Sequence, residues 1–327
     1  SVVLLTNQHL LPLKAETRKI AALGANAGDI RAEYGDWTYL THPTPKPDCE
    51  PARPYRTLLE GIRDLAQPMG AVVTYHRGCG VLPQAEDDID GAVEAARGND
   101  VIVLALGDSI ALHGETRDRA DLSLSGRQTE LFVRLRELHI PIVTVVISSK
   151  PLCLGVVAEQ TDALIMAFNG GMFGGKAVAE VVFGKVNPMG CLPISIPRHS
   201  GQIPVYYNQL PGWHGGKYAD MPIDPDFAFG QGCGYAGFAY RRLRFDPATM
   251  VAQVEVENTG RMTGVETVQV YVHDCVASVM RPVKQLVAFQ RVTLAAGETK
   301  EVRIVIDPSE LALITEDEKR VIETGEF

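Results

Sequence analysis

The chain lacks long apolar runs, excess positive charge and closely paired cysteines. Its 327 residues include 31 Lys and Arg against 40 Asp and Glu, and only 7% are aromatic. No run of about 18 apolar residues occurs, so no membrane-spanning segment is predicted. The net charge of −9 argues against nucleic acid or an anionic membrane as the main partner, because both attract clustered Lys and Arg.

Several short motifs are also missing. There is no GxSxG elbow of a serine hydrolase, no HExxH zinc motif and no GK[ST] of a phosphate-binding loop. The six cysteines are dispersed without a CxxC pair, which favours free or buried thiols over a disulfide framework or a zinc site. We therefore expect no metal and no organic cofactor. The start, SVVLLTNQHLLPLK, has no initiating Met and no basic signal-peptide region, and the compartment stays undetermined.

One glycine motif is misleading. GCGYAG (232–237) fits GxGxxG, but FAYRRLRF follows it and is predicted to be extended. A dinucleotide site needs a helix after these glycines, so a turn is the better interpretation. GANAG (24–28) does follow a predicted strand, and nucleotide binding by that sheet stays open as an alternative.

The first two hundred residues alternate β-branched apolar runs with amphipathic stretches. Continuous apolar runs are typical of strands buried on both faces, and strand–helix alternation predicts a mostly parallel sheet sandwiched by helices, an α/β fold. The predicted strands lie in 19–27, 71–78, 101–108, 140–149 and 162–171. The predicted helices lie in 55–67, 89–97, 126–138 and 174–184.

The rest of the chain changes character twice. Residues 201–245 are rich in Pro and Gly and are predicted to form an irregular linker. From 246 to 327 the apolar residues alternate, as in VAQVEVENTG, ETVQVYVHD and KEVRIVID, which predicts a small antiparallel β-sandwich. The expected domains are therefore 1–200, the linker 201–245 and 246–327.

A charged loop follows the strand predicted at 101–108. HGETRDRADLSL (113–124) holds Glu115, Asp118 and Asp121 together with two arginines. Loops beyond the carboxyl ends of parallel strands form the binding crevice of such sheets, so Glu115 is a candidate general acid/base. The alternative is a solvated loop whose Arg–Asp pairs contribute little to stability.

Four blocks of sequence resemble the carboxyl-terminal half of glycoside hydrolase family 3, and β-glucosidases in particular. They are SVVLLTNQHLLPL, LGDSIALHGETRDRADLSLSGRQTELF, GKVNPMGCLPISIPRHSGQIPVYYN and VASVMRPVKQLVAFQRVTLAAGET. The resemblance implies an α/β sandwich domain followed by a fibronectin type III-like β-sandwich. It also implies a retaining exo-acting β-glycosidase that hydrolyses terminal β-linked sugars with two carboxyl groups.

The resemblance also implies roles for individual residues. Its loop pattern, G-E-x-x-D-R, places the acid/base at Glu115, and Asp118 and Arg119 match the flanking pair that shapes the loop. YGDWT (34–38) resembles a segment that carries an aromatic residue near the sugar, so Trp37 is the candidate substrate-binding platform. The partner implied for Glu115 is an aspartate nucleophile on a (β/α)8 barrel.

The chain departs from the family pattern in two ways. GGMFGG (170–175) replaces the usual P-G-x-E-G-G, so that Gly170 and Phe173 stand for the proline and the acid. No barrel and no S-D-W nucleophile segment occur, and in relatives SVVLL closes a helix that begins earlier. We expect the chain to be part of a longer polypeptide or one half of a two-chain enzyme. A non-catalytic carbohydrate-binding or scaffold module and a glycoside phosphorylase are the alternatives, and the sugar itself is not determined.

Overall fold

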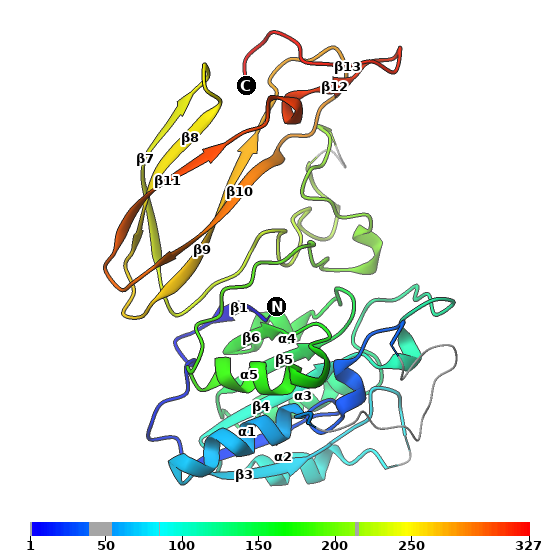
Figure 1. The fold of residues 1–327 in the computed structure, drawn as a ribbon. Coiled ribbons are helices and arrows are strands. Elements are labelled where there is room, and N and C mark those ends of the chain that lie inside the picture. Colours follow the sequence, from blue (N-terminus) through cyan, green and yellow to red (C-terminus); the bar gives the residue numbers. More distant parts are fainter. Residues whose placement is uncertain (1, 39–53, 85, 213–215) are drawn as a thin grey trace. The chain divides into compact units, whose positions relative to one another are not determined.

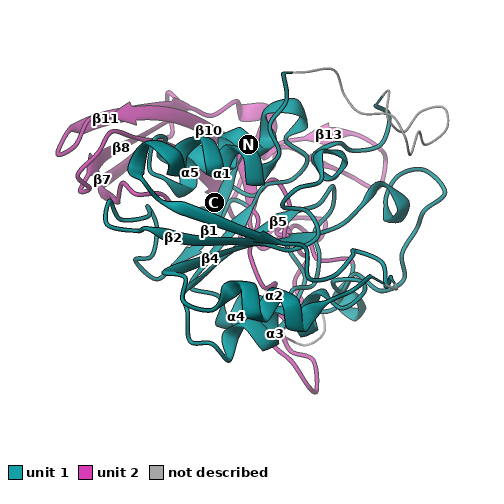
Figure 2. Ribbon diagram, turned by 90° about the horizontal axis from the view of Figure 1, so that it is seen from below, with its two compact units in different colours: residues 1–192, 196–203, 230–233 teal, residues 193–195, 204–229, 234–327 magenta. Residues whose placement is uncertain are grey.

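The computed structural model describes residues 2–38, 54–84, 86–212 and 216–327. The chain divides into two compact units (Figure 2). The first consists of residues 1–192, 196–203 and 230–233. The second consists of residues 193–195, 204–229 and 234–327.

The first unit is built on a six-stranded sheet with the order β1-β6-β5-β4-β2-β3 (Figure 1). All neighbouring pairs are parallel except β1 and β6, which are antiparallel. The predicted, mostly parallel α/β sheet is confirmed. Its strands are β1 (Val3–Asn7), β2 (Lys19–Leu23), β3 (Val72–His76), β4 (Val101–Gly107), β5 (Ile142–Ile147) and β6 (Ala163–Met166).

Helices cover both faces of this sheet. Figure 2 shows α1 and α5 on one face and α2, α3 and α4 on the other. A capping box starts α1, since Thr57 and Glu60 each accept from the other's backbone amide. The helices are α1 (Leu58–Ala66), α2 (Ile89–Ala96), α3 (Gln128–Arg136), α4 (Val156–Gln160) and α5 (Gly174–Val182), and η1 (Ile30–Glu33) and η4 (Gly171–Phe173) are short 3-10 turns.

Two details of the first unit differ from the expectations. Val3–Leu5 lie in strand β1 rather than at the end of a helix. The β-branched Val3 favours the extended chain, and β6 supplies the backbone hydrogen-bond partners of this strand. The run at 71–78 is not buried on both faces, because β3 is an edge strand and Val72 is 65% exposed. By contrast, β4 and β5 are buried throughout.

The second unit is an antiparallel β-sandwich. Its core consists of inward-facing residues that include Val256 and Val302, as the alternating pattern predicted. The strands of its two main sheets pair as β11-β8-β7 and β10-β9. They are β7 (Phe238–Asp246), β8 (Val251–Asn258), β9 (Gly264–Val272), β10 (Gln285–Leu294) and β11 (Thr299–Val305), and a small ladder joins β12 (Leu313–Ile314) to β13 (Arg320–Val321).

Strand β7 begins within the range 201–245 that was expected to be a linker. Its residues do not alternate cleanly between apolar and polar, and most of them are exposed, so the period of two gave no signal. The strand does confirm that GCGYAG precedes extended chain. Cys79, Cys153, Cys191, Cys233 and Cys275 are free, and Cys49 lies outside the described residues. Within the described part of the chain, no helix has the length and hydropathy to cross a membrane.

Candidate functional site

The candidate site lies where β2 and β4 end side by side. The chain leaves β2 towards β3 at the sheet edge, and then returns to β4 on the other side of β2. Such a reversal of strand order opens a crevice at the carboxyl ends of the strands, where α/β sheets bind ligands. The segment after β2 leads to Trp37, and the segment after β4 leads to Glu115.

Glu115 is exposed, but its backbone is held. The Glu115 amide donates to Oδ2 of Asp36 at 3.0 Å, which ties the loop after β4 to the segment after β2. Gly114 has φ of +104°, and a Cβ at this position would lie 2.4 Å from the same oxygen. A glycine is therefore required for Asp36 to approach this closely.

Arg117 is also attached to this junction. Its Nη1 donates to the carbonyl oxygen of His113 at 3.1 Å and lies 3.9 Å from Oδ1 of Asp36. The Asp36 side chain is only 14% exposed. Because an ion pair is stronger out of bulk water, this arrangement restricts the loop around Glu115 more than a solvated surface pair would.

A buried carboxylate supports the base of the loop. Asp108 follows β4 directly, its side chain is fully buried, and it pairs with Lys150. Nζ of Lys150 also donates to the Leu112 carbonyl at 2.8 Å. Arg119 donates to the Ser123 carbonyl at 2.8 Å and places Nη1 3.9 Å from Asp108. These contacts suit the loop-shaping role predicted for Arg119.

The other predicted residues are less tightly held. Asp118 is exposed, and its side chain makes no hydrogen bond or ion pair with the described residues. Trp37 is 65% exposed and has a φ of +62°. An exposed indole beside Asp36 is compatible with a sugar platform, because aromatic faces pack on apolar surfaces while polar groups stay in water.

Two buried titratable groups flank this junction. His113 is 4% exposed, burial lowers its pKa, and neither ring nitrogen has a hydrogen-bond partner among the described residues. Burial also raises the pKa of Glu33 to about 7; the Gly170 backbone opposes this rise, and Asp29 adds to it. Both pKa shifts therefore favour the neutral form of the side chain.

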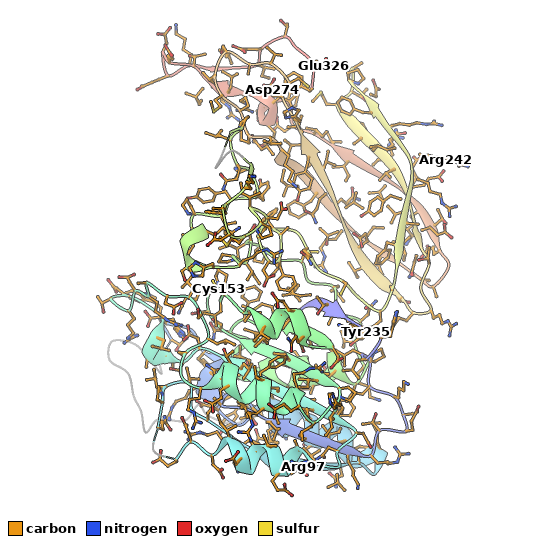
Figure 3. All side chains as sticks on the ribbon, turned by 180° about the vertical axis from the view of Figure 1, so that it is seen from behind. Arg97, Cys153, Tyr235, Arg242, Asp274 and Glu326 are labelled. Carbon is orange, nitrogen blue, oxygen red and sulfur yellow. The ribbon has the colours of Figure 1, made fainter. Side chains whose placement is uncertain are left out.

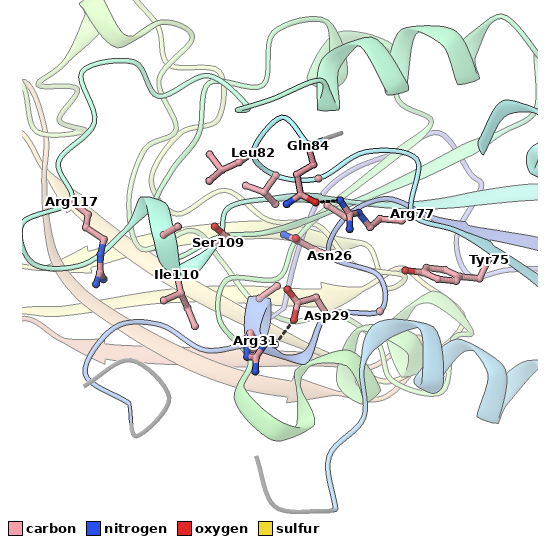
Figure 4. Close-up of a pocket in the computed structure, with 16 residues that line it drawn as sticks. Asn26, Asp29, Arg31, Tyr75, Arg77, Leu82, Gln84, Ser109, Ile110 and Arg117 are labelled. Atoms are coloured by element: carbon pink, nitrogen blue, oxygen red, sulfur yellow. Dashed lines mark hydrogen bonds between the residues drawn. The ribbon is translucent and has the colours of Figure 1, made fainter. Parts of the chain in front are cut away.

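A pocket of about 930 Å³ opens at the same edge of the sheet. Figure 4 shows Arg117 at one end and Tyr75 at the other. Its charged lining consists of Asp29 and the three guanidinium groups of Arg31, Arg77 and Arg117. The pocket thus combines hydrogen-bond donors and acceptors with an aromatic wall, which suits a ligand that carries many hydroxyl groups.

No sequence pattern singles out the residues that support the site. Asp36, Asp108, Lys150 and Glu33 carry no motif of their own, and their partners are distant in sequence. Two signals were available: Asp108 is the last residue of a predicted strand, and Asp36 stands next to Trp37. Neither signal reveals the partner of the carboxylate, which only the fold brings into contact.

Comparison with known proteins identifies the family. Residues 2–235 match the glycosyl hydrolase family 3 C-terminal domain, and residues 266–327 match a fibronectin type III-like domain. The chain belongs to glycosyl hydrolase family 3. This confirms the resemblance and the class of both folds.

Relatives in family 3 align with the whole chain. A beta-xylosidase of Formosa agariphila is 36% identical, and a periplasmic beta-glucosidase of Salmonella typhimurium is 34% identical. The alignments cover 100% of this chain and 46% of each relative. The chain thus spans about half the length of these curated relatives.

Solved beta-glucosidase structures have the same fold. A beta-glucosidase from intestinal bacteria, involved in saponin metabolism, superposes with a TM-score of 0.91 at 36% identity, over 98% of this chain and 49% of that one. A beta-glucosidase from Listeria innocua, solved with glucose, superposes with a TM-score of 0.84 at 30% identity, over 99% of this chain and 45% of that one. Both superpositions cover nearly all of this chain and about half of the other protein.

Proposed function

We propose that this chain is the carboxyl-terminal part of a retaining, exo-acting β-glycosidase, with terminal β-glucosides as the first substrates to test. Glu115 is the general acid/base. The nucleophile is an aspartate on a (β/α)8 barrel outside this chain. No metal or organic cofactor takes part in this mechanism.

The observation that carries the proposal is the attachment of the Glu115 loop at the β2–β4 crevice. A carboxyl group on a held backbone, exposed at that edge, is available to a substrate bound there. Relatives that align with the whole chain are named beta-glucosidase or beta-xylosidase, which supports glucose or xylose as the sugar.

The reaction has two steps. In the first, Glu115 gives its proton to the glycosidic oxygen as the carbon–oxygen bond breaks, while the aspartate bonds to the anomeric carbon. In the second, the Glu115 carboxylate takes a proton from water, whose oxygen displaces the aspartate and releases the sugar. Retention requires the two carboxyl groups to be about 5–5.5 Å apart.

The test compares two leaving groups in the protein that joins this chain to its barrel. Replacing Glu115→Ala should lower kcat/KM on an alkyl glucoside by roughly 10²–10⁴-fold, because a poor leaving group depends on protonation. An aryl glucoside with a good leaving group should lose much less. Glu130→Ala is the matched control, since Glu130 is a surface residue of α3 paired with Arg127.

Three results would contradict the proposal. Unchanged hydrolysis of the alkyl glucoside by Glu115→Ala would remove Glu115 from the mechanism. Robust hydrolysis by the isolated chain would show that the nucleophile is not outside it. Turnover that depends on inorganic phosphate would indicate phosphorolysis instead.

A further inference from the structure

Asp36 contacts the loop of the proposed proton donor from a different strand connection. Oδ2 accepts from the Glu115 amide at 3.0 Å, and Oδ1 lies 3.9 Å from Arg117. The Asp36 carboxylate thus contacts both Glu115 and Arg117. The contact spans 79 positions of sequence, so it fixes the loop with respect to the segment after β2.

The segment that carries Asp36 is itself anchored. Nδ2 of Asn169 donates to the Ala32 carbonyl at 3.0 Å. Glu33, 1% exposed, packs against the start of α5, where a Cβ on Gly174 would lie 2.1 Å from its Oε2. A residue on a loosely held loop could not position another, whereas Asp36 follows a turn that is fixed to the chain after β6.

Packing at Gly114 shows how closely the two segments fit. Because a Cβ at Gly114 would approach Oδ2 of Asp36 to 2.4 Å, any other residue there would push the carboxylate away. The positive φ of Gly114 adds strain for such a residue. Both sides of the contact can therefore be altered independently.

We propose that Asp36 is a positioning residue for Glu115: it holds the backbone from which the proton donor reaches the substrate. The inference rests on the proposed role of Glu115. A misplacement of about 1 Å can lower a rate by roughly 100-fold, because proton transfer needs the donor within hydrogen-bond reach. Loss of the Asp36 carboxylate therefore reduces acid catalysis and leaves the Glu115 carboxyl group itself in place.

The experiment uses the protein joined to its barrel and the same two glucosides. Asp36→Ala should lower kcat/KM on the alkyl glucoside by roughly 10–100-fold and change kcat/KM on the activated aryl glucoside by less than about threefold, because kcat/KM reports the first step and a good leaving group needs no proton there. Asp36→Asn should recover most of the loss, because its amide oxygen can still accept from the Glu115 amide. A purely structural role would lower both rates together.

Gly114→Ala approaches the same contact from the loop side and should reproduce the selective loss. Gly98→Ala is its matched control: Gly98 also has a positive φ, of +70°, but a Cβ there meets nothing within 4 Å. Thus Gly98→Ala carries the backbone strain alone and should leave the ratio of the two rates unchanged. Selective loss in Gly114→Ala keeps the test decisive even where Asp36→Ala fails to fold.

The outcomes separate the two proposals. If Glu115→Ala is selective for the alkyl glucoside while Asp36→Ala and Gly114→Ala lower both rates equally or neither, the positioning role is wrong and Glu115 keeps its role. If Glu115→Ala shows no selectivity, the proposed function is wrong and the positioning role is lost with it.

Discussion

The two units place their ionisable side chains in contrasting ways. In the first unit, Glu33, Asp108 and His113 are buried near the carboxyl ends of β2 and β4. On the strands of the second unit, Arg242 is exposed and its partner Glu255 is half-buried, and the buried core cluster consists of valine, isoleucine and leucine. A loop of this unit holds a more sheltered pair, Asp274 and Arg281, at 3.7 Å.

This difference is informative because buried charge costs free energy. A fold built for stability alone gains nothing from an isolated carboxylate in its interior, since apolar packing there is at least as favourable. The second unit follows that rule along its strands. In the first unit the departures gather beside the loop of Glu115, which is where local rules are broken when a site requires it.

The largest expected effect comes from removing the buried carboxylate of Asp108. In Asp108→Ala, Lys150 and Arg119 lose their shared partner while 23% and 14% of their side chains are exposed. Removing one partner of a buried ion pair costs about 3–5 kcal/mol, and the partial exposure of the two cations favours the lower end of this range. Urea unfolding of the chain should show a loss of this size. Asp90→Ala, which breaks the exposed pair with Arg134, is the control. A similar small loss for both variants would show that the buried carboxylate of Asp108 contributes no more to stability than an exposed one.

The next effect concerns Glu33 and changes with pH. Its pKa is raised from 4.5 to about 7 in the folded chain, so between these values the folded state holds a proton that the unfolded state has lost. The contribution of Glu33 to the free energy of unfolding therefore falls by about 3 kcal/mol as pH rises from 4.5 to 7, and is constant above that pH.

Glu33→Gln replaces this carboxyl group with a neutral one of similar shape. The variant should match the parent near pH 4.5 and be more stable by about 3 kcal/mol at pH 8. Denaturant midpoints at several pH values test this. If the two curves run parallel from pH 4.5 to 8, burial of Glu33 does not shift its titration.

In the second unit, the comparable experiment removes apolar contact instead of charge. Val256 is 0% exposed and belongs to the sandwich core. Val256→Ala should cost about 2 kcal/mol, from the lost methyl groups and the cavity that remains. Hydrogen exchange of the β8 and β11 amides measures this loss, which should not depend on pH. A pH-dependent loss would mean that an ionisable group contributes to this core.

The sequence predicted these two units unequally well. The alternating pattern placed Val254, Val256 and Val302 correctly in the sandwich core, because a period of two is determined by local geometry. The positions of β4, β5 and their flanking helices also followed from apolar runs and caps. Three edge strands were harder to predict: β1, β3 and β7 each have a single neighbouring strand in their sheet, so their composition is less constrained.

The candidate site, too, could be predicted from the sequence only in part. A motif pointed to Glu115, but nothing local showed that Asp36 binds its amide or that Glu33 packs against Gly174. These contacts join segments that follow different strands. They depend on strand order, with β4 returning beside β2, and that order is a property of the whole sheet.

The smallest expected effect lies on β7, where Arg242 extends away from the sheet (Figure 3) and pairs with Glu255 at 2.7 Å. Its side chain is 70% exposed, so Arg242→Ala should change the free energy of unfolding by less than about 1 kcal/mol. Arg242 also has a φ of +54°, which glycine adopts without strain. Arg242→Gly should therefore be more stable than Arg242→Ala by about 1 kcal/mol in urea unfolding. If Arg242→Ala instead loses as much as Asp108→Ala, exposed and buried ion pairs contribute alike in this chain.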